Sequence, residues 1–270
     1  MGAIKGAVWT VLLRFLVAAV VLLGVAGAIG AALGSTLVPD AGNWSPDPLL
    51  VQPSASRAGT TPSQSKSAPP ATGAAGRAIA VPRTGSGTFV AAVAGGPVHG
   101  GAGRLNRYRV EVEAGTGQDP LEVAAIVDTV LGDPRSWIGG GNVRLQLVPA
   151  GAPAEFTVLL ASPATSEAIC ATGGLRTEGY SSCRLPGRVV LNLARWLTGV
   201  PDYGASLEEY RRYLVNHEVG HQLGHGHESC PAPGAPAPVM QQQTYGLQGC
   251  LANGWPVVNG AMYGGPPAEA

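Results

Sequence analysis

The chain has 270 residues, of which 45% are hydrophobic and 13% are charged, about half the roughly 25% of an ordinary soluble domain. Its 17 basic and 17 acidic side chains give a net charge of zero, which argues against nucleic-acid binding because such proteins need a basic surface. The 40 glycines and 23 prolines indicate that the chain is partly globular and partly low in complexity.

The N-terminal segment, residues 1–35, contains an uncharged apolar run over 15–34. About 20 such residues are enough to cross the hydrocarbon core of a membrane. Lys5 and Arg14 precede the run, and the next basic residue is Arg57, so the positive-inside rule places the rest of the chain outside the cytoplasm. We predict a single-pass membrane anchor. The alternative is a cleaved signal peptide, which would release a secreted protein.

Residues 36–103 differ in composition from the C-terminal part of the chain. They are rich in Pro, Ser, Thr, Ala and Gly, and such a segment buries too little apolar surface to offset its ordering entropy. We therefore predict a disordered stalk, in which His99 has no assigned role. The folded domain is expected over 104–265, with 266–270 as a tail.

The domain shows alternating strand and helix patterns. We predict a half-buried strand over 107–113, because polar and apolar residues alternate there. Asp119 and Pro120 are suited to begin a helix that reaches position 132. Further strands are predicted over 143–148, 156–160 and 188–193, the middle one central because it is the most apolar, and a long helix over 206–224. This order predicts an α+β domain with a mixed sheet.

A histidine-rich motif, HEVGHQLGHGH, occupies residues 217–227. His217 and His221 are four residues apart, so they share one helix face and can bind one zinc ion. Glu218 lies beside them, where it can take a proton from a water on the metal. Gly224 is suited to end the helix in a sharp turn, which would bring His227 back as the third ligand. Three histidines leave one position open for water, as in catalytic zinc sites.

This motif resembles HExxHxxGxxH, the zinc signature of the metzincin metallopeptidases, at every fixed position. The resemblance implies a methionine in a tight turn beneath the metal, and Met240 is the candidate. It also implies a metzincin-like fold: a mixed twisted sheet with an antiparallel edge strand and a backing helix, then the active-site helix and a small C-terminal Met-turn subdomain. The resemblance covers 104–265 in architecture and is specific over 217–240. The chain looks most like an uncharacterised family of exported actinobacterial proteins with the same signature.

Several positions depart from the family pattern. Some metzincins stabilise the transition state with a tyrosine two residues after the methionine, where this chain has Gln242, and Tyr245 is the nearest candidate for that role. His225 could act as a fourth metal ligand, but the family leaves this position variable, so we expect it outside the ligand set. There is no cysteine before Cys170, which excludes a cysteine-based latency switch.

Four cysteines allow two disulfides in three possible pairings. Disulfides are the expected state in an exported domain, and proximity in the sequence favours Cys170–Cys183 and Cys230–Cys250. The second would close a loop that contains Met240, and a loop of that size stabilises a fold by about 3 kcal/mol in the chain-entropy model.

We expect a monomeric, extracytoplasmic zinc-dependent endopeptidase that hydrolyses extracellular polypeptides, with Glu218 as general base and Zn²⁺ as cofactor. The substrate is expected to bind in extended form along the edge strand. Two alternatives share the same residues. One is a cell-envelope binding or structural module with a non-catalytic zinc site, and the other is a metal hydrolase of cell-wall amide bonds.

Overall fold

The computed structural model describes residues 80–268. The predicted membrane anchor and most of the predicted stalk lie outside the described residues. Within 80–268, no helix combines the length and the apolar character needed to cross a membrane.

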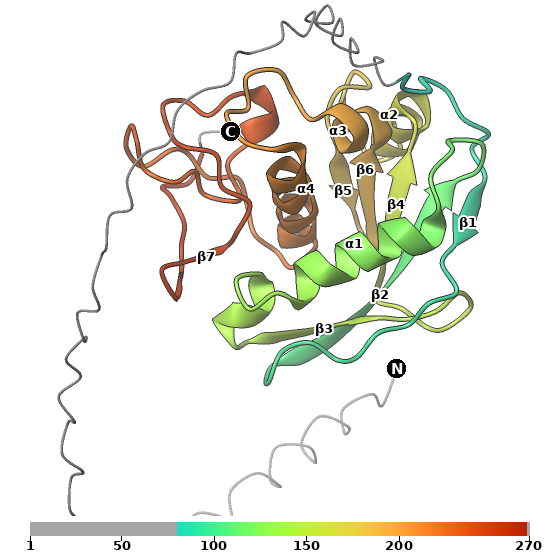
Figure 1. The fold of residues 1–270 in the computed structure, drawn as a ribbon, viewed down its shortest axis with the longest axis horizontal. Helices are drawn as coiled ribbons and strands as arrows, with labels where there is room; N and C mark the ends of the chain where they lie inside the picture. Colours follow the sequence, from blue (N-terminus) through green and yellow to red (C-terminus); the bar gives the residue numbers. More distant parts are fainter. Residues whose placement is uncertain (1–79, 269–270) are drawn as a thin grey trace, which may run out of the picture. The chain divides into compact units, whose positions relative to one another are not determined.

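A mixed β-sheet forms the centre of the domain (Figure 1). Strands β2, β4 and β6 run parallel to one another, and β5 is antiparallel to β6 at one edge. Strand β2 is long enough to pair with β3 along its first half and with β1 along its second half. The strands of this sheet are β1 (Phe89–Ala91), β2 (Arg104–Glu113), β3 (Val143–Leu147), β4 (Phe156–Ala161), β5 (Cys183–Leu185) and β6 (Arg188–Asn192).

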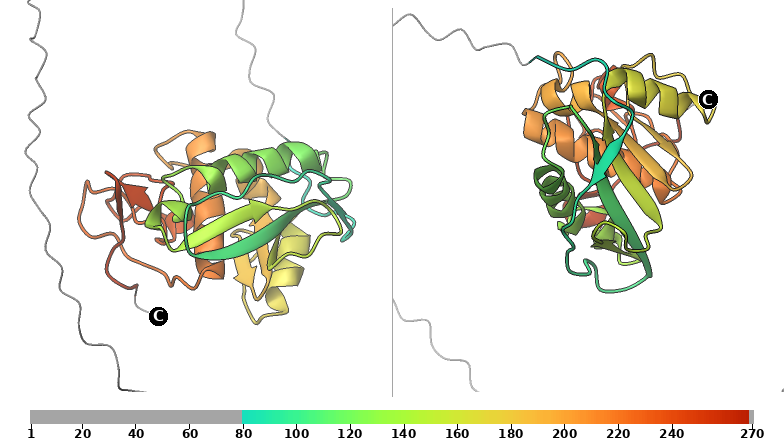
Figure 2. Two further views of the ribbon diagram at one scale, coloured as in Figure 1. Left: turned by 90° about the horizontal axis from the view of Figure 1, so that it is seen from below. Right: turned by 90° about the vertical axis from the view of Figure 1, so that its right-hand side faces the viewer.

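Both faces of the sheet are covered, and alternation along the strands decides which residues face which layer. In β4, Val158 and Leu160 belong to the large core under the first helix and the long helix, whereas Leu159 belongs to a smaller core under α2. Figure 2 shows helix α1 lying across one face of the sheet, with α2 on the other. The helices are α1 (Pro120–Gly132), α2 (Pro163–Ala171), α3 (Leu193–Thr198) and α4 (Leu207–Gln222).

Most long elements agree with the sequence predictions. Asp119 caps α1 by accepting a hydrogen bond from the Leu121 amide, and Pro120 is its first residue. The apolar strand β4 is central, between β2 and β6. The pattern did not predict α2, α3 or the short strands β1 and β5, which show neither a clear alternation nor a clear helical spacing of apolar residues.

The predicted boundary between stalk and domain is wrong, because residues 80–103 belong in large part to the fold. Strand β1 pairs with β2, and the backbone of His99 exchanges hydrogen bonds of 2.8 and 3.0 Å with Leu145. The His99 side chain also lies 3.1 Å from Asp128 Oδ1 on α1. Backbone groups along the free edge of a strand lack hydrogen-bond partners. A glycine-rich segment can supply those hydrogen bonds through its own backbone, and it needs no apolar sequence pattern to do so.

Beyond α4 the chain forms an irregular layer beside that helix (Figure 1). Val239, Met240 and Trp255 join the large core, so this layer is packed onto the sheet domain. Its regular elements are the 3-10 helix η2 (Gln243–Tyr245) and the hairpin of β7 (Val257–Val258) with β8 (Ala261–Met262), while another 3-10 helix, η1 (Trp137–Gly140), precedes β3. Both predicted disulfides, Cys170–Cys183 and Cys230–Cys250, are present.

Candidate metal centre

Helix α4 carries the histidine motif, and contacts at its N-terminus and in its middle fix its position. Ser206 caps its N-terminus by accepting a hydrogen bond from the Glu209 amide. The buried side chain of Asn216 accepts a hydrogen bond from Ser136 Oγ (2.7 Å) and donates one to the Gly254 carbonyl (2.8 Å). An unpaired buried amide would be costly, so Asn216 specifies how α4 sits between η1 and the C-terminal layer.

The three predicted histidine ligands converge. His221 Nε2 lies 3.2 Å from His217 Nε2 and 3.0 Å from His227 Nε2. Among the described residues these three form the one group whose potential ligand atoms all lie within 4.8 Å of one another. An ion with Zn–N distances of about 2.0–2.1 Å requires three nitrogens that point at a common centre, and this arrangement provides them.

Backbone carbonyls hold two of the rings in the orientation that metal binding requires. His217 Nδ1 donates to the Val239 carbonyl (2.8 Å), and His221 Nδ1 donates to the His225 carbonyl (2.9 Å). A carbonyl can only accept, so in both rings Nδ1 carries the proton and Nε2 keeps its free electron pair. Burial lowers the pKa of all three histidines, that of His217 to about 3. The rings are therefore neutral at pH 7, as metal ligands must be.

Gly224 ends the helix as predicted. Its φ of +100° lies in the left-handed region, which glycine adopts without a steric penalty. The His225 amide donates to the Gly220 carbonyl, and the Gly224 amide donates to the His221 carbonyl. These two hydrogen bonds define a Schellman turn, and the turn carries the chain back so that His227 faces the other two rings.

Met240 lies in a tight turn behind the helix. The Gln241 amide donates to the Pro238 carbonyl (2.9 Å), which closes the turn, and the buried Met240 side chain packs against Gly220 of α4. This turn also supplies the Val239 carbonyl that orients His217. The turn thus supports the metal centre through a side-chain contact with the helix and a backbone hydrogen bond to one ligand.

Glu218 occupies the floor of the site. It is 5% exposed, burial raises its pKa to about 8, and its Oε2 has no hydrogen-bond partner among the described residues. A buried unpaired carboxylate oxygen is costly in a folded protein. It is the kind of group that enzymes retain for proton transfer or for binding a ligand.

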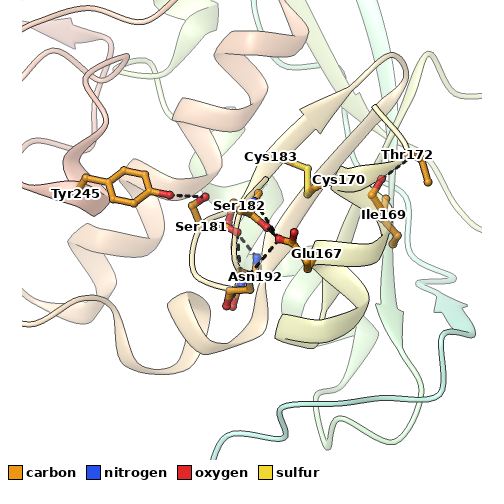
Figure 3. Close-up of a disulfide and its surroundings, with 11 residues drawn as sticks. Glu167, Ile169, Cys170, Thr172, Ser181, Ser182, Cys183, Asn192 and Tyr245 are labelled. Carbon is orange, nitrogen blue, oxygen red and sulfur yellow. Dashed lines mark hydrogen bonds between the residues drawn. A yellow bond between two sulfur atoms is a disulfide. The ribbon is translucent and has the colours of Figure 1, made fainter. Parts of the chain in front are cut away.

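A cavity of about 530 Å³ opens over the histidines and Glu218. One of its walls is the segment 175–184, which leads into edge strand β5, and the opposite wall includes residues of η2. Tyr245 projects from η2 and donates a hydrogen bond of 3.0 Å to Ser181 Oγ, so these two side chains meet across the cavity (Figure 3). Tyr245 is 60% exposed, and it lines the cavity at its rim.

The disulfide Cys170–Cys183 fastens the first wall at its base (Figure 3). Glu167 on α2 adds a second attachment, because its carboxylate accepts hydrogen bonds from the amides of Thr177 (2.9 Å) and Gly179 (3.1 Å). The wall of the cavity next to β5 is therefore held in place from behind by a covalent bond and a carboxylate.

His225 lies outside the group of converging histidines. Its ring stacks on Trp137 with the centroids 4.2 Å apart, and its carbonyl orients His221. Trp137 also donates from Nε1 to the Asn216 carbonyl (2.8 Å) and contacts Gly220. The motif itself did not reveal the supporting roles of Trp137 and Asn216. Asn216 could have been recognised from the sequence as a polar residue on the apolar face of the predicted helix.

The predicted tail takes part in the site, so the predicted domain end at 265 is wrong. The Ser229 amide donates to the Pro266 carbonyl (2.8 Å), and the Ala268 amide donates to the carbonyl of His227 (3.0 Å). Residues 266–268 therefore run beside the third histidine as a short bridge. A proline-rich segment carries no strand pattern, which is why the sequence did not predict this pairing.

Comparisons with known proteins add a family but no activity. No curated protein and no solved structure matches the chain. One family model matches residues 76–253, more than half of the chain, and this range includes the three histidines, Glu218 and Met240. The match also begins before Arg104, in agreement with the early start of the folded domain. The chain belongs to the family described as "Protein of unknown function (DUF3152)".

Proposed function

We propose that this protein is a zinc-dependent endopeptidase of the metzincin type that acts on polypeptides outside the cytoplasm. The observation that carries the proposal is the convergence of three neutral histidines beside the buried, unpartnered carboxylate of Glu218, at the floor of an open cavity. The resemblance of the 217–227 motif and of the Met240 turn to the metzincins supports it.

The donor set fits zinc. His217, His221 and His227 would hold the ion through their Nε2 atoms, and three imidazole ligands with an open side are typical of catalytic rather than structural zinc. When bound, zinc supplies Lewis-acid activation of a water molecule and of the scissile carbonyl. A purely structural site has no need of an unpaired carboxylate next to its ligands, so Glu218 favours catalysis.

Glu218 is the general base in this proposal. Burial raises the pKa of Glu218 to about 8, so its affinity for a proton is high, and a zinc ion held by the adjacent histidines would favour the ionised form that accepts one. It accepts a proton from the attacking water and passes it to the leaving amine. Tyr245, which lines the cavity at its rim, is the proposed donor to a substrate carbonyl once its hydroxyl leaves Ser181.

Strand β5 is suited to bind an extended peptide. It is antiparallel to β6 and pairs with no other described strand on its outer side, which borders the cavity. An extended segment can add to such an edge through main-chain hydrogen bonds, which recognise the backbone of a substrate without regard to its sequence. This favours peptide substrates over the amide bonds of cell-wall glycans.

The two disulfides support a location outside the cytoplasm, because such bonds persist in oxidising compartments. Together with the predicted N-terminal anchor, they favour a membrane-bound or secreted enzyme. Both forms place the cavity where it meets extracellular polypeptides.

The test is proteolysis by the full chain, purified in mild detergent and loaded with zinc. A mixture of diverse peptides is incubated with the protein, and cleavage is followed by mass spectrometry. We expect cleavage that a chelator abolishes and that Glu218→Gln reduces by a factor of at least about 10³, because the base is lost. Zinc binding should remain, since Glu218 is not a ligand.

The matched control is Glu122→Gln, which removes an exposed carboxylate on α1 and should leave cleavage unchanged. Zinc bound at one equivalent without cleavage of any peptide would contradict the proposal. In that case cell-wall fragments are the next substrates to test, and a fold that collapses on chelation would indicate a structural site.

A further inference from the structure

The cavity above the histidines carries more positive than negative charge. Arg176 and Arg184 line it, whereas Glu218 is the one carboxylate among its described lining residues. Glu218 lies at the floor and takes part in proton transfer in the proposed function. The walls that a substrate meets therefore contain two guanidinium groups and no acidic side chain among the described lining residues.

Arg184 is placed at the centre of this arrangement. It is the middle residue of β5, whose neighbours Cys183 and Leu185 are buried, so its side chain points to the opposite face of the strand, toward α4. Its Nε donates to Gln222 Oε1 at 2.9 Å. Gln222 is the last residue of α4 and directly follows the ligand His221.

Arg184 combines a position in the cavity wall with the absence of a carboxylate partner, unlike the paired arginines of the domain. Arg107 pairs with Glu155, and Arg135 pairs with Asp133. Among the described residues, no acidic oxygen lies within 4.0 Å of the Arg184 guanidinium, which leaves its two terminal nitrogens free of any ion pair. A guanidinium fork matches a carboxylate with two parallel hydrogen bonds, so a partly buried, oriented and unpaired arginine in a cavity is suited to an anionic ligand.

We propose that Arg184 determines specificity by binding a carboxylate of the substrate close to the scissile bond, with Gln222 holding the guanidinium in position. This inference rests on the proposed peptidase function and adds the chemical class of its substrates: peptides that carry a negative charge near the cleavage site. The carboxylate has two possible sources, an Asp or Glu side chain or the C-terminus of the peptide. Arg176, on the exposed rim, adds to the attraction at longer range.

The experiment uses the zinc-loaded full chain and peptides that differ at one position, Glu against Gln, each with a free and with an amidated C-terminus. Cleavage is measured as kcat/KM by the wild-type protein. Binding of the same fluorescein-labelled peptides is measured by anisotropy with the Glu218→Ala protein, which cannot turn them over. We expect the better carboxylate source to improve both quantities by about tenfold or more, the usual effect of one charge-assisted hydrogen-bonded pair.

Arg184→Gln should reduce this preference to less than about twofold without loss of zinc or of thermal stability, and Arg184→Lys should retain only part of it because the fork is lost. Arg188→Gln, at the exposed end of the neighbouring strand β6, is the matched control and should keep the full preference. A preference for Glu that survives amidation identifies the side chain as the source, whereas one that amidation removes identifies the C-terminus.

The two hypotheses fail in different ways. Cleavage without any preference for a carboxylate, or a preference that Arg184→Gln leaves intact, overturns the inference and leaves the peptidase standing. Absence of cleavage, with carboxylate-dependent binding that Arg184→Gln removes, overturns the peptidase function and keeps Arg184 as an anion-binding residue. Absence of both cleavage and carboxylate-dependent binding overturns both.

Discussion

Gly220 lies inside helix α4, where glycine normally costs about 1 kcal/mol relative to alanine. The structure explains why this position carries it. A Cβ built at Gly220 would lie 2.6 Å from Trp137 Cζ2 and closer still to Met240 Sδ. The missing side chain allows the Met240 turn and Trp137 to approach the helix closely at this position. Packing, and not helix propensity, thus explains why glycine occupies position 220 of the motif.

We predict that Gly220→Ala lowers the free energy of unfolding by about 1–2 kcal/mol, because overpacking in a core outweighs the gain in helix propensity. Thermal unfolding followed by circular dichroism should show a drop of several degrees in Tm. Gly101→Ala is the control, since a Cβ there meets nothing within 4 Å. An unchanged or higher Tm for Gly220→Ala would show that the side chains of Met240 and Trp137 move aside with little cost in free energy.

At the residue scale, spacing alone predicted the metal-binding group, because four-residue spacing on a helix and a glycine-ended turn impose geometry locally. His217, His221 and His227 converge as the motif required. The roles of Asn216 and Arg184 could not be predicted in this way. The role of Asn216 depends on its contact with Gly254, and that of Arg184 depends on its position in the cavity wall. A local sequence pattern contains neither.

At the scale of elements, Glu113 links three parts of the fold. It ends β2 and is 1% exposed. Its carboxylate accepts hydrogen bonds from the Gly87 amide (2.8 Å), the Ser162 amide (2.7 Å) and Thr165 Oγ1 (2.6 Å). One side chain therefore ties the N-terminal segment and the start of α2 to the sheet. Burial alone would raise the pKa of Glu113, but these hydrogen bonds outweigh burial and lower it below 4.5.

The lowered pKa fixes the direction of a pH effect. Ionised Glu113 stabilises the folded state at pH values above its ordinary pKa of 4.5, and this stabilisation is lost as the pH falls through the lower pKa of the folded state. We predict that Glu113→Gln lowers the free energy of unfolding by about 1–3 kcal/mol at pH 7. Urea unfolding should show the difference from wild type shrinking below about pH 4.

Glu111→Gln on the same strand is the control. Its partner Arg109 lies 3.6 Å away and both side chains are partly exposed, so its loss should cost less than about 1 kcal/mol at any pH. A Glu113→Gln deficit that stays constant from pH 7 to pH 3 would mean that packing, and not the charge, explains the effect.

The elements themselves were predictable where apolar residues recur with a clear period. Helices α1 and α4 and strands β2, β3, β4 and β6 had enough periodicity or apolar character to be located from the sequence. Strand β1 was missed because three residues in a glycine-rich stretch show no alternation. The antiparallel edge β5 was expected from the family resemblance, but its position was not, because disulfide closure and pairing with β6 define it rather than its own composition.

At the scale of the whole domain, the site is assembled from segments far apart in the chain. The wall from 175 to 184, helix α4 with its turn, the segment around Met240 and the bridge at 266–268 all meet there. Only α4 and its turn carry the recognisable motif. The others depend on tertiary packing, which no local sequence pattern contains, and the predicted domain limits of 104 and 265 therefore left out segments that pack onto the fold.

We predict that removal of the bridge weakens the metal centre. A chain that ends at residue 264 loses the hydrogen bonds of Pro266 and Ala268 to the segment of His227. Supporting contacts of metal ligands typically contribute 10–100-fold to affinity, so zinc affinity should fall by about tenfold or more in competition with a chromophoric chelator. A chain that ends at Ala268 keeps both hydrogen bonds and is the control. Equal affinity of the two chains would contradict a role for the bridge.

The bridge also has a consequence for biosynthesis. A nascent chain has all three histidines as soon as residue 227 has been added, but the carbonyl that orients His217 comes at 239 and the bridge beside His227 only at 266–268. A growing chain shorter than this has the metal ligands without the groups that hold them in place. Domains fold as units once their parts are available, so we expect the proposed site to become able to hold a metal only after residue 268 has been added.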